Sequence, residues 1–180
     1  MNRLDLFFPG MASLPNLHPL FVHFPIAFFF GALVMEGVAI FYDEKCHLVA
    51  SWMLYLGAVS AVMALATGFI AESSLAVADP RGHDSPGHDY IHIHRAWMVA
   101  STLLGVLTAG YLFWINYKKM WATHYFRLLI GLMLLSLVVS MGADRGGRLV
   151  FEFGTGVKPS LLKDTDHNDL HDNGDKDDHH

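Results

Sequence analysis

The residues best suited to chemistry are two histidines at the start of the first apolar stretch, His18 and His23, in the segment HPLFVHFP at 18–25. An imidazole at the mouth of a membrane helix is costly to desolvate unless something binds it. Pro19 suits the first turn of a helix, with His18 as the N-cap. Pro25 removes the backbone hydrogen bond to the carbonyl of residue 21 and should kink or loosen that turn. We therefore expect His23 to face the helix bundle and bind a ligand, with His18 as a surface cap or a supporting residue.

A second group of histidines, His83, His88, His92 and His94, precedes the third apolar stretch. One histidine from each of two helices, facing across a bundle, is the arrangement that binds haem b through two axial imidazoles. We expect His94 to be the partner of His23 because it lies deeper, with His92 as the alternative. Copper or zinc is the alternative ligand, and the remaining interpretation is that no cofactor binds.

Charged residues near these histidines suit a haem site. Arg95, Arg145 and Arg148 are candidates to pair with the haem propionates. Glu72 ends the second apolar stretch and is expected to orient a ligand histidine or to ligate a metal directly. Small residues either leave room for a porphyrin or let the helices pack closely. Those below the two ligands are Ala27, Gly31, Ser101 and Gly105.

A possible second site lies towards the opposite face of the membrane. His47 begins the second apolar stretch and His124 begins the fourth, so a second haem between them would give a route across the membrane. The alternative is that both are interfacial histidines. Glu36 lies within the first stretch, and an ionisable group there is a functional candidate. It either carries protons, binds a quinone, or forms a structural hydrogen bond, with His47 and His124 as candidate partners.

Four apolar stretches must position these residues, at about 24–42, 48–71, 96–116 and 125–142. Each approaches or exceeds the ~18 residues that indicate a membrane span. Hydrophobic residues make up 53% of the 180-residue chain and charged residues 16%. A soluble bundle is the alternative, but a soluble helix needs a polar face, which 48–71 lacks. The sequence thus predicts an all-α fold, a transmembrane four-helix bundle in contact with the lipid bilayer.

The distribution of basic residues predicts the orientation of the bundle. Lys45, Lys118 and Lys119 lie in two short loops, so the positive-inside rule places both termini on the exterior side and Cys46 on the cytoplasmic side. We divide the chain into an interfacial segment (1–16), a membrane domain (17–158) and an acidic, histidine-rich tail (159–180) that we expect to be disordered. Within the membrane domain, the glycine-punctuated segment 146–157 is expected to fold back over the exterior end of the bundle.

Several motifs resemble those of one family. The opening segment HPLFVHFPIA at 18–27, Glu36, Thr67-Gly68, and the closing segment GGRLVF at 146–151 with GTGV at 154–157 resemble the "domain of unknown function 2231" family. The resemblance covers about residues 14–158. It implies a small bacterial inner-membrane protein with four spans. Arg148 departs from the acidic residue that the family often has at that position.

The combined features favour a subunit over a free-standing enzyme. Nothing resembles a hydrolase triad, a phosphate-binding loop or a nucleic-acid-binding module. We interpret the chain as a membrane electron-transfer subunit with haem b, working with a cytochrome c, a quinone pool or other subunits of a respiratory complex. The alternatives are a copper- or zinc-handling membrane protein and a non-catalytic scaffold.

Overall fold

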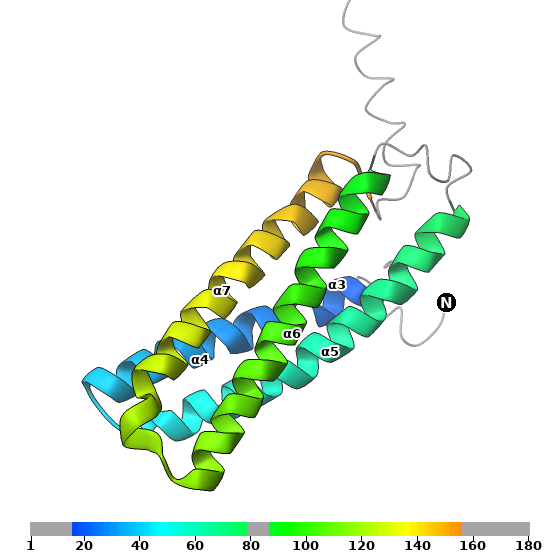
Figure 1. Ribbon diagram of the computed structural model, residues 1–180. Helices are drawn as coiled ribbons and strands as arrows, with labels where there is room; N and C mark the ends of the chain where they lie inside the picture. Colours follow the sequence, from blue (N-terminus) through cyan, green and yellow to red (C-terminus); the bar gives the residue numbers. More distant parts are fainter. Residues whose placement is uncertain (1–15, 79–86, 156–180) are drawn as a thin grey trace, which may run out of the picture.

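The computed structural model describes residues 16–78 and 87–155 and shows only helices there (Figure 1). The short helix α3 (His18–Phe21) leads into α4 (His23–Phe41). Three long helices follow: α5 (Cys46–Ala78), α6 (His88–Lys118) and α7 (Trp121–Phe151). We call the end of the bundle where α3 and α6 begin and α5 and α7 end the histidine end. The opposite end, where α4 and α6 end, is the glutamate end.

Four stretches of the described chain are long and apolar enough to cross a membrane: His18–Phe41, Cys46–Ser74, His88–Lys118 and His124–Phe151. Their outer faces are apolar too. On α5, exposed apolar residues recur every three to four residues over most of the helix, which makes one continuous stripe. These residues are Leu48, Trp52, Leu56, Val59 and Met63. An exposed apolar stripe on a long helix is suited to lipid, not to water. The prediction of an all-α transmembrane bundle is confirmed, whereas the side on which the termini lie stays a prediction.

The break between α3 and α4 lies where Pro25 predicts it. A proline at position 25 has no N–H to donate to the carbonyl of Phe21, four residues earlier. Helix α3 ends at Phe21, and Val22 separates it from α4 while keeping helical angles (φ −66°, ψ −25°). The chain direction therefore changes little at the break. At the start of α3, the Asn16 side chain accepts a hydrogen bond from the backbone N–H of His18 (3.1 Å).

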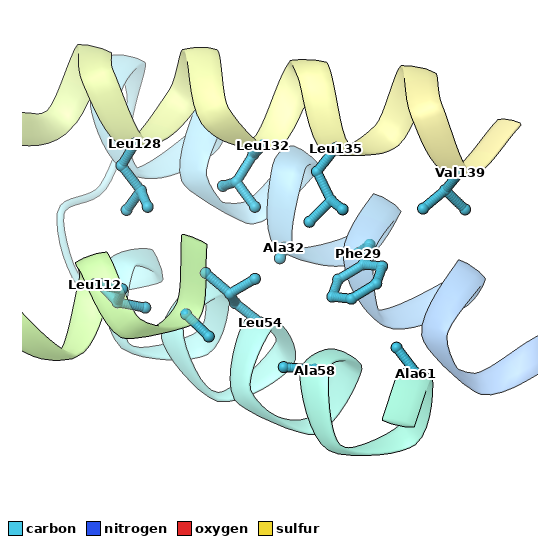
Figure 2. Close-up of a cluster of buried hydrophobic side chains, with 11 residues drawn as sticks. Phe29, Ala32, Leu54, Ala58, Ala61, Leu112, Leu128, Leu132, Leu135 and Val139 are labelled. Atoms are coloured by element: carbon cyan, nitrogen blue, oxygen red, sulfur yellow. The ribbon is translucent and has the colours of Figure 1, made fainter. Parts of the chain in front are cut away.

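Buried leucines and alanines from all four long helices form the core (Figure 2). Phe29 on α4 is its largest side chain and is only 1% exposed. Its ring packs against Gly57 on α5 and Gly105 on α6, where an added Cβ would lie 2.6 Å and 2.7 Å from ring carbons. Membrane helices gain little from excluding lipid, so small residues that permit such close contact hold the bundle together.

The prediction that segment 146–157 folds back is wrong for its first half. Helix α7 continues through Gly146 and Gly147 to Phe151. Glycine is tolerated in membrane helices because neighbouring helices support the backbone. The chain turns only at Gly154, which has a positive φ of 62°, and the N–H of Thr155 donates to the carbonyl of Leu149 (2.9 Å). The segment 1–15 and the tail after 155, including most of the predicted interfacial segment, lie outside the described residues.

Candidate ligand site at the histidine end

A cavity of about 550 Å³ opens at the histidine end and is lined by residues of α3 to α7. In Figure 1, α5 lies apart from α6 and α7 at this end, and α3 lies between them. Phe29 lines the cavity and also belongs to the hydrophobic core, so its side chain lies at the boundary between the cavity and the core. The walls are mostly apolar, and the few ionisable side chains among them are His18, His94, Glu72 and Arg95.

His18 reaches the cavity from α3 by packing against α5. Its Nδ1 lies 3.1 Å from the backbone carbonyl of Ala64 and 3.3 Å from the Thr67 hydroxyl. Because a carbonyl oxygen only accepts, Nδ1–H is the donor. The ring lies over Gly68, where an added Cβ would be 3.1 Å from His18 Cε1. Gly68 therefore provides the space that lets this ring reach the carbonyl of Ala64.

His94 reaches the cavity from α6 and packs against α7 in the same way. Its Nδ1 donates to the backbone carbonyl of Gly142 (3.0 Å). The ring lies over Gly146, where an added Cβ would be 2.9 Å from His94 Cε1. Here too, a glycine on the neighbouring helix leaves the space that the ring fills.

His18 and His94 are thus held by the same arrangement of contacts. In each case a histidine donates through Nδ1 to a carbonyl, and the glycine four residues later in that helix leaves space for the ring. A neutral imidazole with its hydrogen on Nδ1 keeps the lone pair on Nε2. Histidines that bind metals are fixed in this way, with the other ring nitrogen bonded to a carbonyl. The two rings lie in the lining of one cavity, and each is held through its Nδ1.

The expectation that His23 faces the bundle is wrong. His23 is exposed, and its Nδ1 bonds to the carbonyl of Pro19 four residues earlier (2.7 Å). Five residues of helix separate it from His18, which corresponds to a rotation of about 140°. Only one of the two can face the bundle, and it is His18, the residue that we had assigned to the surface or to a supporting role.

Among the other predicted residues, Glu72 and Arg95 line the cavity and pair with each other, with Arg95 Nη1 2.8 Å from Glu72 Oε1. The expectation that Glu72 orients His23 or His94 is wrong, because its carboxylate is bound to Arg95 instead. His92 is not in the cavity lining; its Nε2 is 3.1 Å from His88 Nε2 and its Nδ1 is 3.8 Å from Glu72. Between the alternatives on α6, His94 is the one that lines the cavity.

The two remaining arginines lie outside the cavity lining. Arg145 is stacked over the Trp97 ring at 4.4 Å and donates to the carbonyl of Met141. Arg148 donates to Tyr90 and forms an ion pair with Glu152 at 2.7 Å. Of the three predicted propionate partners, the structure brings only Arg95 to the cavity.

The predicted small residues mostly serve packing. Gly105 holds the Phe29 ring, and Gly31 lies against the Met53 side chain. Ala27 is exposed, and Ser101 alone of these four lines the cavity.

At the glutamate end, His47 and His124 do not share a site. The Nδ1 atom of His47 is bound to Glu36, whereas that of His124 is 2.5 Å from the Tyr111 hydroxyl. A pocket at this end is lined by His47 but not by His124. The structure therefore does not bring His47 and His124 to one pocket, and His47 is the hydrogen-bond partner of Glu36.

The structure describes the side chains of residues 16–74, 87–120 and 124–155. There, no three His, Cys, Asp or Glu side chains are grouped so that they could hold a metal ion. His83 and the tail histidines lie outside the described residues.

Sequence reasoning missed Gly68 and Gly146, which leave space for the two rings, and it missed that His18 faces inwards. The buried residues of α4 recur every three or four positions: Pro25, Phe29, Ala32, Glu36 and Ala39. His18 lies seven residues before Pro25, which is about two helical turns, so it falls on the same face of the helix. His23 lies two residues before Pro25, a rotation of about 200° about the helix axis, so it falls on a different face. His18 therefore continues the inward-facing stripe of α4, whereas His23 does not.

Comparisons with known proteins support the membrane assignment. Neither the curated proteins nor the solved structures gave a match. A family model described as "Predicted membrane protein (DUF2231)" matches residues 14–159, which include His18, Gly68, His94 and Gly146. Because the match covers most of the chain, this protein belongs to the DUF2231 family of membrane proteins.

Proposed function

We propose that the protein binds one haem b in the cavity at the histidine end, where His18 and His94 would hold its iron, and acts as an electron-transfer subunit. The observation that carries the proposal is the repeated construction that fixes both imidazoles by Nδ1 on main-chain carbonyls. Two imidazoles from two helices of a bundle suit a haem iron, which needs no further protein ligand. Three-ligand metal sites, as for catalytic zinc, need more donors than this pair supplies.

The cavity also suits a large, mostly apolar ligand. Its volume of about 550 Å³ is in the usual range of small-molecule sites. Phe29, Ile26 and Val139 offer apolar surface, and Arg95 offers the one guanidinium of the lining for a ligand carboxylate. A bound haem would supply one-electron redox chemistry. The chain itself would hold the ligand by its two imidazoles, exclude water with the apolar wall, and pair one carboxylate.

The shape of the protein favours a role within a larger assembly. Most of the described chain is membrane helix, and the connection between α4 and α5 is only a few residues long. Electrons would therefore come from and go to separate redox partners. We propose a bacterial inner-membrane location, with a cytochrome c, a quinone or respiratory subunits as these partners.

Haem titration of the purified protein in lipid nanodiscs tests the proposal. We expect one haem per chain and a low-spin spectrum that is typical of two imidazole ligands. Replacing His18 or His94 by Ala should abolish the low-spin form, whereas His23→Ala, the matched control, should leave it unchanged. Binding of copper or zinc with no haem binding would contradict the proposal, as would an unchanged spectrum in both ligand variants.

A further inference from the structure

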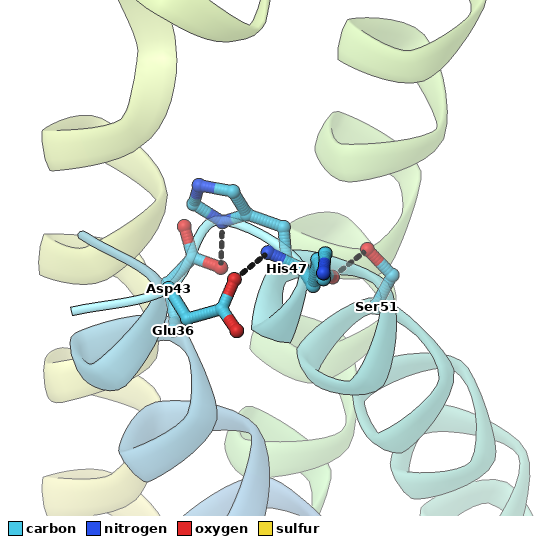
Figure 3. A network of polar contacts seen from close by, with 5 residues as sticks. Glu36, Asp43, His47 and Ser51 are labelled. Carbon is cyan, nitrogen blue, oxygen red and sulfur yellow. Dashed lines mark hydrogen bonds and ion pairs between the residues drawn. The ribbon is translucent and has the colours of Figure 1, made fainter.

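A buried acidic group at the glutamate end has no role in the ligand cavity. Glu36 on α4 is 0% exposed. Its Oε2 lies 3.0 Å from His47 Nδ1, whereas its Oε1 is buried and has no hydrogen-bond partner in the described part of the chain (Figure 3). A buried ionised carboxylate needs compensation for both oxygens, and Glu36 has it for one. The arrangement suits a carboxyl group that gains and loses a proton.

His47 connects this carboxyl group to the surface. Its side chain is 14% exposed and lines a pocket together with Glu44 and Lys45 from the loop between α4 and α5. The ring is held in place by stacking on Tyr125, with centroids 4.7 Å apart and planes 5° from parallel. A fixed imidazole between solvent and a buried carboxyl group is suited to pass protons between them.

Several other ionisable groups at this end have partners other than Glu36. Tyr111 on α6 is bound to His124 on α7, and Tyr55 on α5 accepts from Asn116. In the connecting loop, Asp43 accepts from the backbone N–H of Lys45.

Glu44 and Lys45 are exposed, and Tyr125 faces the His47 ring. Within the described residues none of these groups bonds to Glu36, so His47 is its one hydrogen-bond partner.

We infer that Glu36 and His47 form a proton-binding site that exchanges one proton with the solvent at the glutamate end. A proton from solvent adds to the imidazole of His47, and the Nδ1 proton passes along the hydrogen bond to Glu36. An N–H bond breaks and an O–H bond forms at Oε2, so the pair gains one proton in total. The inference goes beyond the proposed function because it needs no ligand in the cavity.

Infrared difference spectroscopy against pH tests this inference in nanodiscs, with isotope-labelled glutamate to separate glutamate from aspartate bands. We expect a carbonyl band of a protonated glutamate that changes with pH, shifts in D₂O and is lost in Glu36→Gln. The matched control, Glu152→Gln, changes an exposed glutamate at the histidine end and should keep this band. In His47→Asn the band should move, because the carboxyl group loses its imidazole partner.

Two results would overturn the inference. One is a band that persists unchanged in Glu36→Gln. The other is a labelled wild-type protein that shows no glutamate band with these properties at any pH at which it stays folded. If Glu36→Gln does not fold, the inference is tested by the labelled wild type and by His47→Asn. A glutamate carbonyl band at the wild-type position in His47→Asn would contradict the pairing of Glu36 with His47.

Discussion

Adding one methyl group at Gly146 should weaken ligand binding without destabilising the protein. In Gly146→Ala the new Cβ would lie 2.9 Å from His94 Cε1. Carbon atoms prefer about 3.5–4.0 Å, so the imidazole must move by at least roughly 0.6 Å. The hydrogen bond from Nδ1 to Gly142 is already 3.0 Å long, and such a shift would take it beyond the usual range.

Two opposing terms set the effect on stability. Losing one hydrogen bond costs about 0.5–1.5 kcal/mol. Replacing glycine by alanine inside a helix stabilises the folded protein by about 0.8–1.0 kcal/mol. The free energy of unfolding should therefore change by no more than about 1 kcal/mol.

For ligand affinity, no favourable term offsets the displacement of the His94 ring. Changes to the groups that orient a metal-bound histidine typically cost about 10- to 100-fold in affinity, and we expect a loss in this range for haem. Gly68→Ala should have a smaller effect in the same direction, because its Cβ would lie 3.1 Å from His18 Cε1.

Gly110→Ala on α6 is the matched control. No atom lies within 4 Å of its added Cβ and Gly110 is not in the cavity lining, so haem affinity should stay at the wild-type value. The assays are haem titration in nanodiscs for affinity and unfolding in mixed micelles for stability. Equal losses of affinity at Gly146 and Gly110, or no loss at either, would refute the account of how His94 is held.

Further expectations concern the cavity, the core and the orientation. Arg95→Gln should weaken haem binding by about tenfold, since a charge-assisted hydrogen bond contributes about 1.5 kcal/mol, whereas Glu72→Gln should strengthen it by freeing Arg95; equal effects in titrations of the two variants would contradict this. Phe29→Ala should lower the free energy of unfolding in mixed micelles by about 3–5 kcal/mol, because the ring fills the space between two glycines; a change below 1 kcal/mol would show that the core does not depend on it. Cys46, the chain's single cysteine, should react with a membrane-impermeant maleimide in inverted vesicles and not in right-side-out ones; the reverse result would place the termini on the cytoplasmic side.

The membrane fold was predictable because it depends on length and apolar composition. Four stretches long enough to span a bilayer leave few alternatives. The break before α4 was predictable as well, since Pro25 removes a specific hydrogen bond. The end of α7 was not, because the same glycine pair that breaks a soluble helix is tolerated in a membrane helix.

The position of the cavity was predictable, but its lining was predictable only in part. The histidine clusters predicted a ligand at the end of the bundle where the cavity lies, and of His92 and His94 it is the deeper one, His94, that lines the cavity. His23 was preferred over His18 for the same reason, and depth was misleading because rotation about the helix axis decides which side chain faces inwards. The roles of Gly68 and Gly146 depend on contacts between helices, which no local pattern in the sequence reveals.

The absorption spectrum of protein purified from haem-sufficient cells, oxidised and then reduced with dithionite, tests the central claim most directly. We expect a b-type spectrum that is kept in His23→Ala and lost in both His18→Ala and His94→Ala. A haem-free protein that also fails to bind added haem would contradict the account. So would a spectrum that depends on His23 and not on His18.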